Sequence, residues 1–266
     1  MKGTQAVIVG GGVMGEALLA AALDRGVFEP EDVTVIEKVD ARRVQLKAAY
    51  GVEATADFAP MGEAGLVVLA VKPQELASVR GRLRPGALLL SIMAGVRIAA
   101  IEAAFDHPFI VRAMPNTPAA VKAGMTVWTA APVVTVDQRS MARMLLGAVG
   151  KEVYVDDERK IDMATAVSGS GPAYVYLFIE ALVEGAVAVG LPRAMAEELV
   201  LQTVYGSAVY AQESGKSAAE LRAMVTSPSG TTAAGLLELE RGALRARVIE
   251  AVRAAHARAV ELGGGS

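Results

Sequence analysis

A glycine-rich segment close to the start of the chain constrains the fold more strongly than any other feature of the sequence. It reads Gly-Gly-Gly-Val-Met-Gly over residues 10–15 and directly follows the apolar run Ala6–Val9. In such a segment Gly10 permits a tight turn, Gly12 lets the backbone approach a pyrophosphate, and Gly15 lets the following helix pack against the strand. The N–H groups at the start of that helix then face the phosphates. The segment therefore predicts a dinucleotide-binding unit, and a simple glycine-rich turn is the alternative.

Short apolar runs alternate with helical patterns over the first part of the chain. The predicted strands are Ala6–Val9, Val33–Ile36, Leu66–Val71, Ala87–Leu90, Phe109–Val111, Thr126–Thr129 and Glu152–Val155. The predicted helices are Val13–Arg25, Ala41–Tyr50, Gln74–Leu83 and Gln138–Val149. Continuous apolar runs are typical of parallel strands that are buried on both faces. Their alternation with helices predicts an α/β fold, with an N-terminal Rossmann-type doubly wound parallel sheet and right-handed crossovers.

The second part of the chain shows helical patterns alone. Pro172 suits the first position of a helix, and Ser217 with Glu220 forms a capping-box pattern before another. A chain of 266 residues is long enough for two ordinary domains. We therefore expect a dinucleotide-binding domain over residues 1–157 and an all-α domain for dimerisation and substrate binding over residues 158–266.

The first long helix of the second part is apolar on more than one face. It is rich in alanine over residues 173–189. A small helical domain cannot cover so much apolar surface by itself. We predict that this surface forms a homodimer interface, and tight packing of alanines within one chain is the alternative.

Composition and charge exclude several classes of site. The chain has no cysteine, which excludes disulfides, thiolate metal sites and cysteine nucleophiles, and its two histidines are too few for a histidine-rich metal site. With 26 basic and 29 acidic side chains the net charge is -3, so the chain lacks the excess positive charge that is typical of nucleic-acid-binding proteins. Glycines and glutamates interrupt the apolar stretches 6–23 and 174–191, and we expect no secretory leader. We therefore expect a cytoplasmic protein without a membrane span and without a metal.

The residues after the second predicted strand bear on which dinucleotide binds. Glu37 lies about 20 residues past the glycine segment, where an acid hydrogen-bonds the ribose hydroxyls and repels a 2′-phosphate. Lys38, Arg42 and Arg43 follow and offer that phosphate a cationic site, and all four residues otherwise form a solvated charged edge. We predict NADH rather than NADPH as the preferred cofactor.

Four further segments lie where ligands bind in such folds. Lys72 before Pro73 ends a predicted strand and either contacts the cofactor or is only exposed. Residues 114–118 contain two prolines and form either a rigid turn or a wall beside the nicotinamide. The small-residue loops 168–172 and 226–232 each precede a helix, where free N–H groups and hydroxyls favour a carboxylate or phosphate. Ordinary N-capping is the alternative for both loops.

The histidines add little to the chemistry. His107 and His256 are expected at the surface rather than at a catalytic centre. Without histidine or cysteine catalysts, the predicted cofactor indicates a redox reaction that needs no strong protein acid. Hydride transfer to an imine that is already protonated meets this requirement.

Together these motifs resemble those of pyrroline-5-carboxylate reductases, and the resemblance covers nearly the whole chain. It rests on Gly10-Gly11-Gly12-Val13-Met14-Gly15, Ala70-Val71-Lys72-Pro73-Gln74, Met114-Pro115-Asn116-Thr117-Pro118, Ser168-Gly169-Ser170-Gly171-Pro172-Ala173-Tyr174 and Val225-Thr226-Ser227-Pro228-Ser229-Gly230-Thr231-Thr232. The last two segments are far more specific than the glycine motif. The resemblance implies reduction of L-1-pyrroline-5-carboxylate to L-proline with NADH or NADPH. It also implies helical domains that interlock as a dimer, an active site between a cofactor domain and those helical domains, and in some members the assembly of dimers into decamers.

The resemblance assigns roles to individual residues. It implies that the dinucleotide is bound by Gly10, Gly11, Gly12, Val13, Met14, Gly15, Val71, Lys72, Pro73 and Ala94, with Asn116 near the nicotinamide. To this predicted set we add Glu37, Lys38, Asp57 and Ala70. It implies that the substrate is bound by Glu158, Ser227, Gly230, Thr231 and Thr232. Thr232 is implied to be the catalytic residue, hydrogen-bonded to the ring nitrogen while the hydride passes from C4 of the nicotinamide to C5 of the ring. Positioning and charge complementarity then supply most of the acceleration.

Two positions depart from the family pattern. Ser229 stands where glycine is usual, which reduces the backbone freedom of that loop. Asp57 stands where many members have an asparagine near the adenosine ribose. An acid there adds to Glu37 in disfavouring a 2′-phosphate, although many members use either cofactor.

Other functions stay open beside this one. A reductase of a related cyclic imine is the nearest alternative. A β-hydroxyacid dehydrogenase would need a lysine on the long helix, and residues 172–189 contain none. The third alternative is a dimer that senses a dinucleotide and has no catalytic activity. Such a protein would not need a loop that binds a carboxylate, as the one with Thr231 and Thr232 is expected to do.

Overall fold

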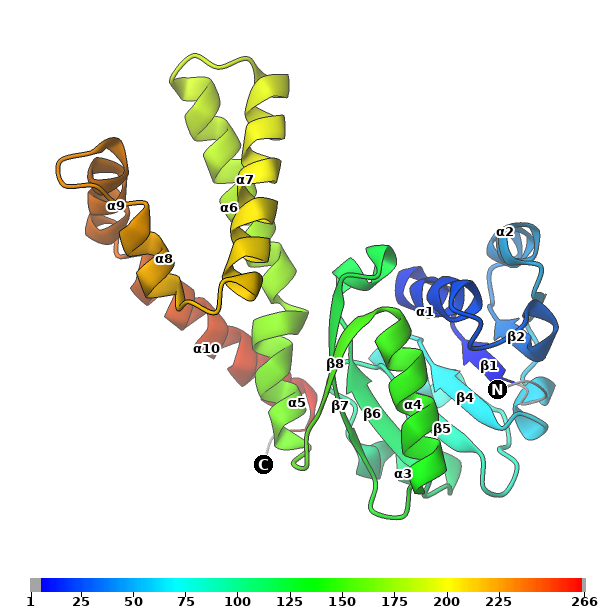
Figure 1. Cartoon of the computed structure of the whole chain (residues 1–266). Helices are drawn as coiled ribbons and strands as arrows, with labels where there is room; N and C mark the ends of the chain where they lie inside the picture. Colours follow the sequence, from blue (N-terminus) through cyan, green and yellow to red (C-terminus); the bar gives the residue numbers. More distant parts are fainter. Residues whose placement is uncertain (1–5, 265–266) are drawn as a thin grey trace. The chain divides into compact units, whose positions relative to one another are not determined.

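The computed structural model describes residues 6–264 and shows two compact units (Figure 1). The first, here called the sheet unit, comprises the chain up to Ser170 together with the segment from Ala255 onwards. The second, here called the helical unit, is Gly171–Ala254. The C-terminal turns of the last helix thus belong to the sheet unit.

The sheet unit is built on one eight-stranded sheet with the strand order β3-β2-β1-β4-β5-β6-β7-β8. The strands are β1 (Ala6–Val9), β2 (Val33–Ile36), β3 (Glu53–Thr55), β4 (Leu66–Leu69), β5 (Leu88–Ser91), β6 (Ile110–Met114), β7 (Gly124–Ala130) and β8 (Gly150–Tyr154). Neighbouring strands are parallel except β6 and β7. Only the 3₁₀ helix η4 (Thr117–Val121) connects this pair, which is too short for a parallel crossover. The predicted Rossmann-type parallel sheet is confirmed, with one antiparallel pair added.

The core lies on both faces of the central strands. Every residue of β4 and β5 is at most 1% exposed. Helices α1 (Val13–Asp24), α3 (Ile98–Phe105) and α4 (Val136–Ala148) pack against the sheet, and α1 also contacts α4. The helix α2 (Asp40–Tyr50) follows β2. Burial on both faces explains why these strands are continuous apolar runs.

Several local predictions differ from the structure. Residues 74–83 do not form an α-helix but the 3₁₀ helix η3 (Pro73–Ser78) and an irregular segment. That segment brings Gly81 against Met61, and a Cβ on Gly81 would lie 2.2 Å from the Met61 Sδ. The elements β3 and α3 were not predicted from the sequence.

The prediction that His107 lies at the surface is wrong. Its side chain is buried, with only 6% of the residue exposed, and its Nε2 lies 2.6 Å from the carbonyl oxygen of Ala87. The imidazole therefore satisfies a main-chain acceptor inside the sheet unit, which is a structural role.

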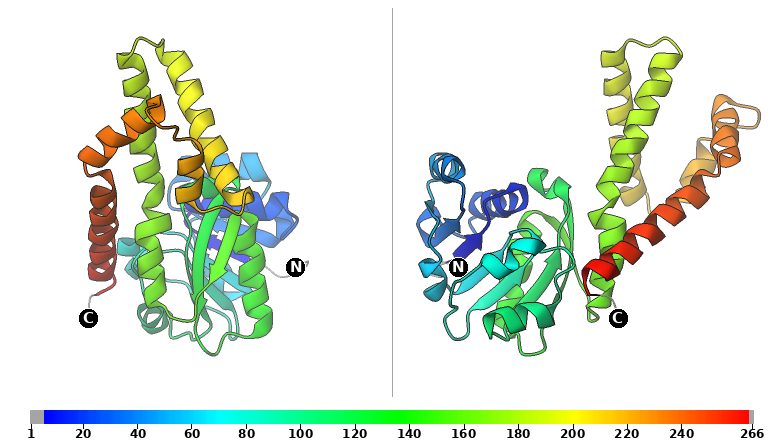
Figure 2. Two further views of the ribbon diagram at one scale, coloured as in Figure 1. Left: turned by 60° about the vertical axis from the view of Figure 1, so that its left-hand side comes forward. Right: turned by 180° about the vertical axis from the view of Figure 1, so that it is seen from behind.

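The helical unit contains α6 (Gly171–Ala188), α7 (Arg193–Glu213), α8 (Ala218–Met224), α9 (Thr231–Arg241) and most of α10 (Leu244–Leu262). Its first two helices form a hairpin around Val183, Ala196 and Val200 (Figure 2). The predicted capping box is present, because the Glu220 N–H donates to the Ser217 hydroxyl at the start of α8. In the sheet unit, the short helix α5 (Arg159–Ala164) and the π-helical turn η5 (Thr165–Gly169) lead into α6.

Candidate active site

A pocket of about 470 Å³ opens in the sheet unit beyond the carboxyl ends of β1, β2 and β4. The chain order reverses at β1, which lies between β2 and β4, and open α/β sheets bind ligands at such a point. The pocket is lined by Val9, Gly10, Gly12, Ile36, Glu37, Lys38, Ala56, Phe58, Ala70, Val71, Lys72, Glu75, Ser78 and Val79. Seven of the residues predicted to bind the dinucleotide therefore line one pocket: Gly10, Gly12, Glu37, Lys38, Ala70, Val71 and Lys72.

Close packing requires the glycines between β1 and α1. Gly10 has a φ of 104°, and a Cβ there would lie 2.7 Å from the carbonyl oxygen of Ala70. A Cβ on Gly15 would lie 2.0 Å from the carbonyl oxygen of Gly10. Gly12 is the N-cap of α1 and brings no side chain to the N–H groups of the first turn. These N–H groups are the donors that a pyrophosphate binds.

Two main-chain donors hold the Glu37 carboxylate at the end of β2. Its Oε2 accepts from the Gly11 N–H at 2.9 Å, and its Oε1 accepts from the Val39 N–H at 2.9 Å. The first bond joins the acid directly to the glycine loop. The carboxylate is therefore preorganised on the pocket wall, as ribose recognition requires.

Other groups of the protein already bind the three cations that follow Glu37. Lys38 forms an ion pair with Glu75. Arg42 donates from Nε to the Gly11 carbonyl oxygen at 2.8 Å and pairs with Glu16. The adjacent Arg43 donates to the carbonyl oxygens of residues 37 and 38 and pairs with Asp40. The alternative that these residues form only a solvated charged edge does not describe the two arginines.

The other predicted dinucleotide residues lie outside the pocket lining. They are Gly11, Val13, Met14, Gly15, Asp57, Pro73, Ala94 and Asn116. Asp57 is exposed, and its Oδ1 accepts from the Ala59 N–H at 3.0 Å, while its neighbours Ala56 and Phe58 line the pocket. Sequence reasoning missed Phe58, Ser78 and Val79, and only the position of Phe58 beside Asp57 was a signal for any of them.

Asn116 anchors the loop after β6. Its Nδ2 donates to the Ser168 carbonyl oxygen at 3.0 Å, and its Oδ1 accepts from the Met125 N–H at 2.8 Å. Both ends of the amide are thus used to tie residues 114–118 to β7 and to the π-helical turn η5. The structure brings together two segments that the sequence analysis treated separately.

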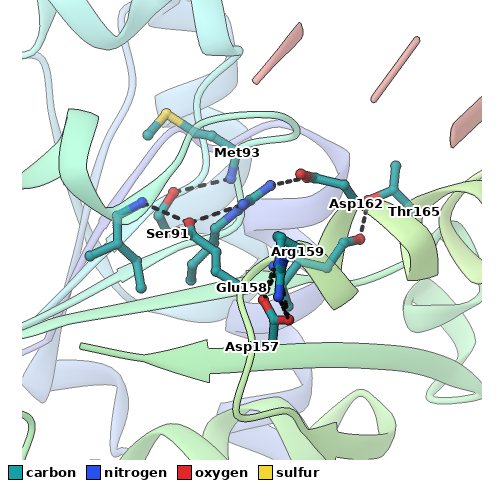
Figure 3. A network of polar contacts seen from close by, with 10 residues as sticks. Ser91, Met93, Asp157, Glu158, Arg159, Asp162 and Thr165 are labelled. Carbon is teal, nitrogen blue, oxygen red and sulfur yellow. Dashed lines mark hydrogen bonds and ion pairs between the residues drawn. The ribbon is translucent and has the colours of Figure 1, made fainter. Parts of the chain in front are cut away.

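A buried ion cluster joins β6 to the start of α5 (Figure 3). Arg112 is 1% exposed, and it donates to Glu158 Oε1 at 2.9 Å and to Asp162 Oδ1 at 2.6 Å. The same Glu158 oxygen accepts from the Ile98 N–H at 2.8 Å. The sequence analysis identified Glu158 but missed Arg112 and Asp162. An arginine inside an apolar strand was a signal that it has a buried acidic partner.

Within residues 6–264, no group of three or more His, Asp or Glu side chains is placed to hold a metal ion.

The loop before α9 carries the other predicted substrate residues in the helical unit. Gly230 is the N-cap of α9, and a Cβ there would lie 2.3 Å from the Ser227 Oγ. Thr231 and Thr232 form the first turn of the helix. Ser229 has a φ of 59°, so the residue that replaces the usual glycine does adopt a left-handed conformation. Ser227 is exposed at the mouth of this turn.

Comparison with known proteins places the chain in a family. Residues 158–262 match the family model described as pyrroline-5-carboxylate reductase dimerisation, and residues 5–95 match the model described as NADP oxidoreductase, coenzyme F420-dependent. The chain is 46% identical over 260 residues to a pyrroline-5-carboxylate reductase of Synechocystis sp., with 96% of this chain and 97% of that protein covered. This chain belongs to the pyrroline-5-carboxylate reductase family. The resemblance predicted from the motifs is confirmed.

Solved structures of pyrroline-5-carboxylate reductases share the fold. That of the Coxiella burnetii protein has a TM-score of 0.87 and 37% identity, and covers 97% of this chain and 98% of its own. The Plasmodium falciparum protein, solved with NADP bound, has a TM-score of 0.87 and 29% identity, with 99% of both chains covered. These comparisons support a nicotinamide dinucleotide cofactor for this chain, and seven of the residues predicted to bind one line its pocket.

Proposed function

We propose that this chain reduces L-1-pyrroline-5-carboxylate to L-proline. The observation that carries the proposal is family membership over 96% of the chain. It is joined to a pocket at the glycine loop, where Gly10 and Gly15 allow close packing of the backbone. When bound, the nicotinamide supplies a hydride from its C4 to C5 of the pyrroline ring. The imine nitrogen keeps the proton that it already carries, so the chain needs no strong acid at this point.

Different residues at the carboxyl ends of the strands of the sheet unit would bind successive parts of the dinucleotide. The first-turn N–H groups of α1 would bind the pyrophosphate, and Glu37 would accept from the ribose hydroxyls. Ile36, Phe58 and Val79 supply apolar surface for the adenine. By analogy with the family, the nicotinamide end would be lined by Ala70, Val71, Lys72, Pro73, Ala94 and Asn116.

We favour NADH over NADPH on electrostatic grounds. The N–H groups of Gly11 and Val39 hold the Glu37 carboxylate on the pocket wall, and the exposed acid Asp57 lies between two residues that line the same pocket. Lys38, Arg42 and Arg43 already have partners within the chain. A 2′-phosphate would therefore meet fixed negative charge and cations that are already bound. NADP in the Plasmodium falciparum relative makes this a preference within the family.

The loop before α9 is proposed to bind the substrate. The N–H groups of Gly230 and Thr231 and the Ser227 hydroxyl would hold the carboxylate, because a helix N-terminus favours an anion. Thr232 would hydrogen-bond the ring nitrogen. Glu158, whose Oε1 is held by Arg112, would contact the substrate from the start of the domain that matches the family's dimerisation model.

The apolar surface of the helical unit is assigned to a second copy of the chain. Among the described residues, the stretch 159–188 is long and apolar enough to cross a membrane, and only 11% of its apolar window is buried. Because it lies within the matched dimerisation region 158–262, we propose that a homodimer covers it, with residues 158–266 acting as the dimerisation domain. A decamer assembled from such dimers is the larger assembly that we propose, in the cytoplasm and without nucleic acid or membrane as partner.

The test is oxidation of NADH and of NADPH, in parallel, by purified protein with pyrroline-5-carboxylate. Faster turnover with NADH supports both the reaction and the cofactor preference, whereas faster turnover with NADPH overturns the preference alone. No turnover with either cofactor would favour the two alternative functions, a reductase of a related cyclic imine or a dinucleotide sensor.

The variant Thr232→Ala should lose about 100-fold in kcat/KM with cofactor binding retained. Unchanged turnover of that variant contradicts the role of Thr232.

A further inference from the structure

An ion pair crosses the dinucleotide pocket between two strand ends. Lys38 lies two residues after β2, and Glu75 lies in η3, which follows β4. Because β2 and β4 flank β1 on opposite sides, the pair spans the strand that carries the glycine loop. Both residues line the pocket, and their side chains are in contact as an ion pair.

Glu75 is the fixed partner of this pair. Its Oε2 accepts from the Lys72 N–H at 3.2 Å, and the hydroxyl of Ser78 donates to its carbonyl oxygen at 2.6 Å. The Glu75 side chain is 30% exposed, whereas that of Lys38 is 77% exposed. The flexible lysine thus reaches across to a carboxylate that η3 holds in place.

The arginines beyond Lys38 are held by other contacts. Arg42 and Arg43 bind carbonyl oxygens of the glycine loop and of the turn after β2, and their side chains are 27% and 20% exposed. Releasing either would leave main-chain acceptors unpaired. Of the three cations, only Lys38 lines the pocket. Lys38 is therefore the cation that can turn to a 2′-phosphate at the smallest cost.

We propose that Glu75 is a specificity-determining residue that keeps Lys38 from the 2′-phosphate of NADPH. It does so because its carboxylate occupies the Lys38 ammonium group. The ribose of NADH presents a hydroxyl at that position and does not need this cation. The inference rests on the proposed binding of a dinucleotide in this pocket, but it does not depend on the identity of the imine.

Electrostatics of the pair agree with this arrangement. The hydrogen bond and charge of Glu75 raise the pKa of Lys38, and Lys38 in turn lowers the pKa of Glu75. Both groups are therefore charged across the physiological range. The pair persists as an ion pair until a stronger anion competes for the lysine.

The test is direct binding of NAD⁺ and NADP⁺ by calorimetry, without substrate and without turnover. Glu75→Gln keeps the size of the side chain and an acceptor for the Lys72 N–H, but releases Lys38. We expect the ratio of the NAD⁺ to the NADP⁺ dissociation constant to rise about fivefold, and this gain should shrink at about 0.5 M salt. The double variant Glu75→Gln/Lys38→Met should return the ratio to that of the wild type.

The matched control removes an acid from another ion pair of the same unit. Glu53→Gln breaks the exposed pair with Lys47, and neither residue lines the pocket. Its ratio of dissociation constants should equal that of the wild type. An unchanged ratio in Glu75→Gln, or a gain that survives in the double variant, overturns the proposal. Wild-type protein that binds neither dinucleotide overturns the proposed cofactor site itself, which is a different result.

Discussion

The two units differ in how they cover their own apolar surface. In the sheet unit one core runs through all the central strands and the helices on both faces. In the described part of the helical unit, the apolar cluster has only Val183, Ala196 and Val200 as its buried members. Large side chains such as Leu177 and Tyr205 are more than 60% exposed there. The comparison indicates that the sheet unit buries its own apolar side chains, whereas the helical unit leaves many of its own for a partner surface.

The largest effect should come from the buried ion cluster of the sheet unit. Arg112→Met leaves Glu158 and Asp162 without their cation, at a cost of about 3–5 kcal/mol in the free energy of unfolding. Urea denaturation followed by circular dichroism measures it. Arg159→Gln is the control, because the Arg159–Asp157 pair is exposed and should contribute far less to the free energy of unfolding. Equal losses in both variants would show that the cluster is no more important than a surface pair.

The next effect tests the helical unit directly. Leu177→Asp places a charge on a side chain of α6 that is 67% exposed in the single chain. If a second copy covers it, the variant loses about 2–3 kcal/mol per subunit and becomes monomeric at micromolar concentration. Light scattering after size exclusion reports the mass. Val136→Asp on α4, at a side chain that is 79% exposed, should leave the mass unchanged. A dimeric Leu177→Asp protein would contradict the interface.

The smallest effect concerns the backbone of the substrate loop. Ser229→Gly relieves a left-handed conformation with φ of 59°. The gain is partly offset by the greater freedom of glycine in the unfolded chain, so we expect a net stabilisation of at most about 1 kcal/mol. Thermal unfolding measures this change in stability. Asp106→Gly replaces another left-handed residue, with φ of 48°, and gives the corresponding change in the sheet unit. A destabilised Ser229→Gly variant would mean that the hydroxyl supports the loop.

Local patterns predicted the elements that are buried evenly along their length. The runs Ala6–Val9 and Val33–Ile36 are strands with the predicted bounds, because burial on both faces leaves a continuous apolar sequence. The edge strand β3 was missed, since its three residues include an exposed glutamate. The helix α3 was also missed, although Ile98, Ile101 and Phe105 have helical spacing.

The sequence by itself determined the glycine loop, the acid that follows β2 and the family, because each depends on residues close together along the chain. Only the tertiary structure decided how distant charges pair. Lys38 lies 37 positions from Glu75, and Arg112 lies 50 positions from Asp162. No local pattern encodes such pairs, since the sheet order brings their strands and helices together. The physical reason is that a charge takes the partner that the packed backbone places within reach, and that partner decides whether the charge is available to a ligand.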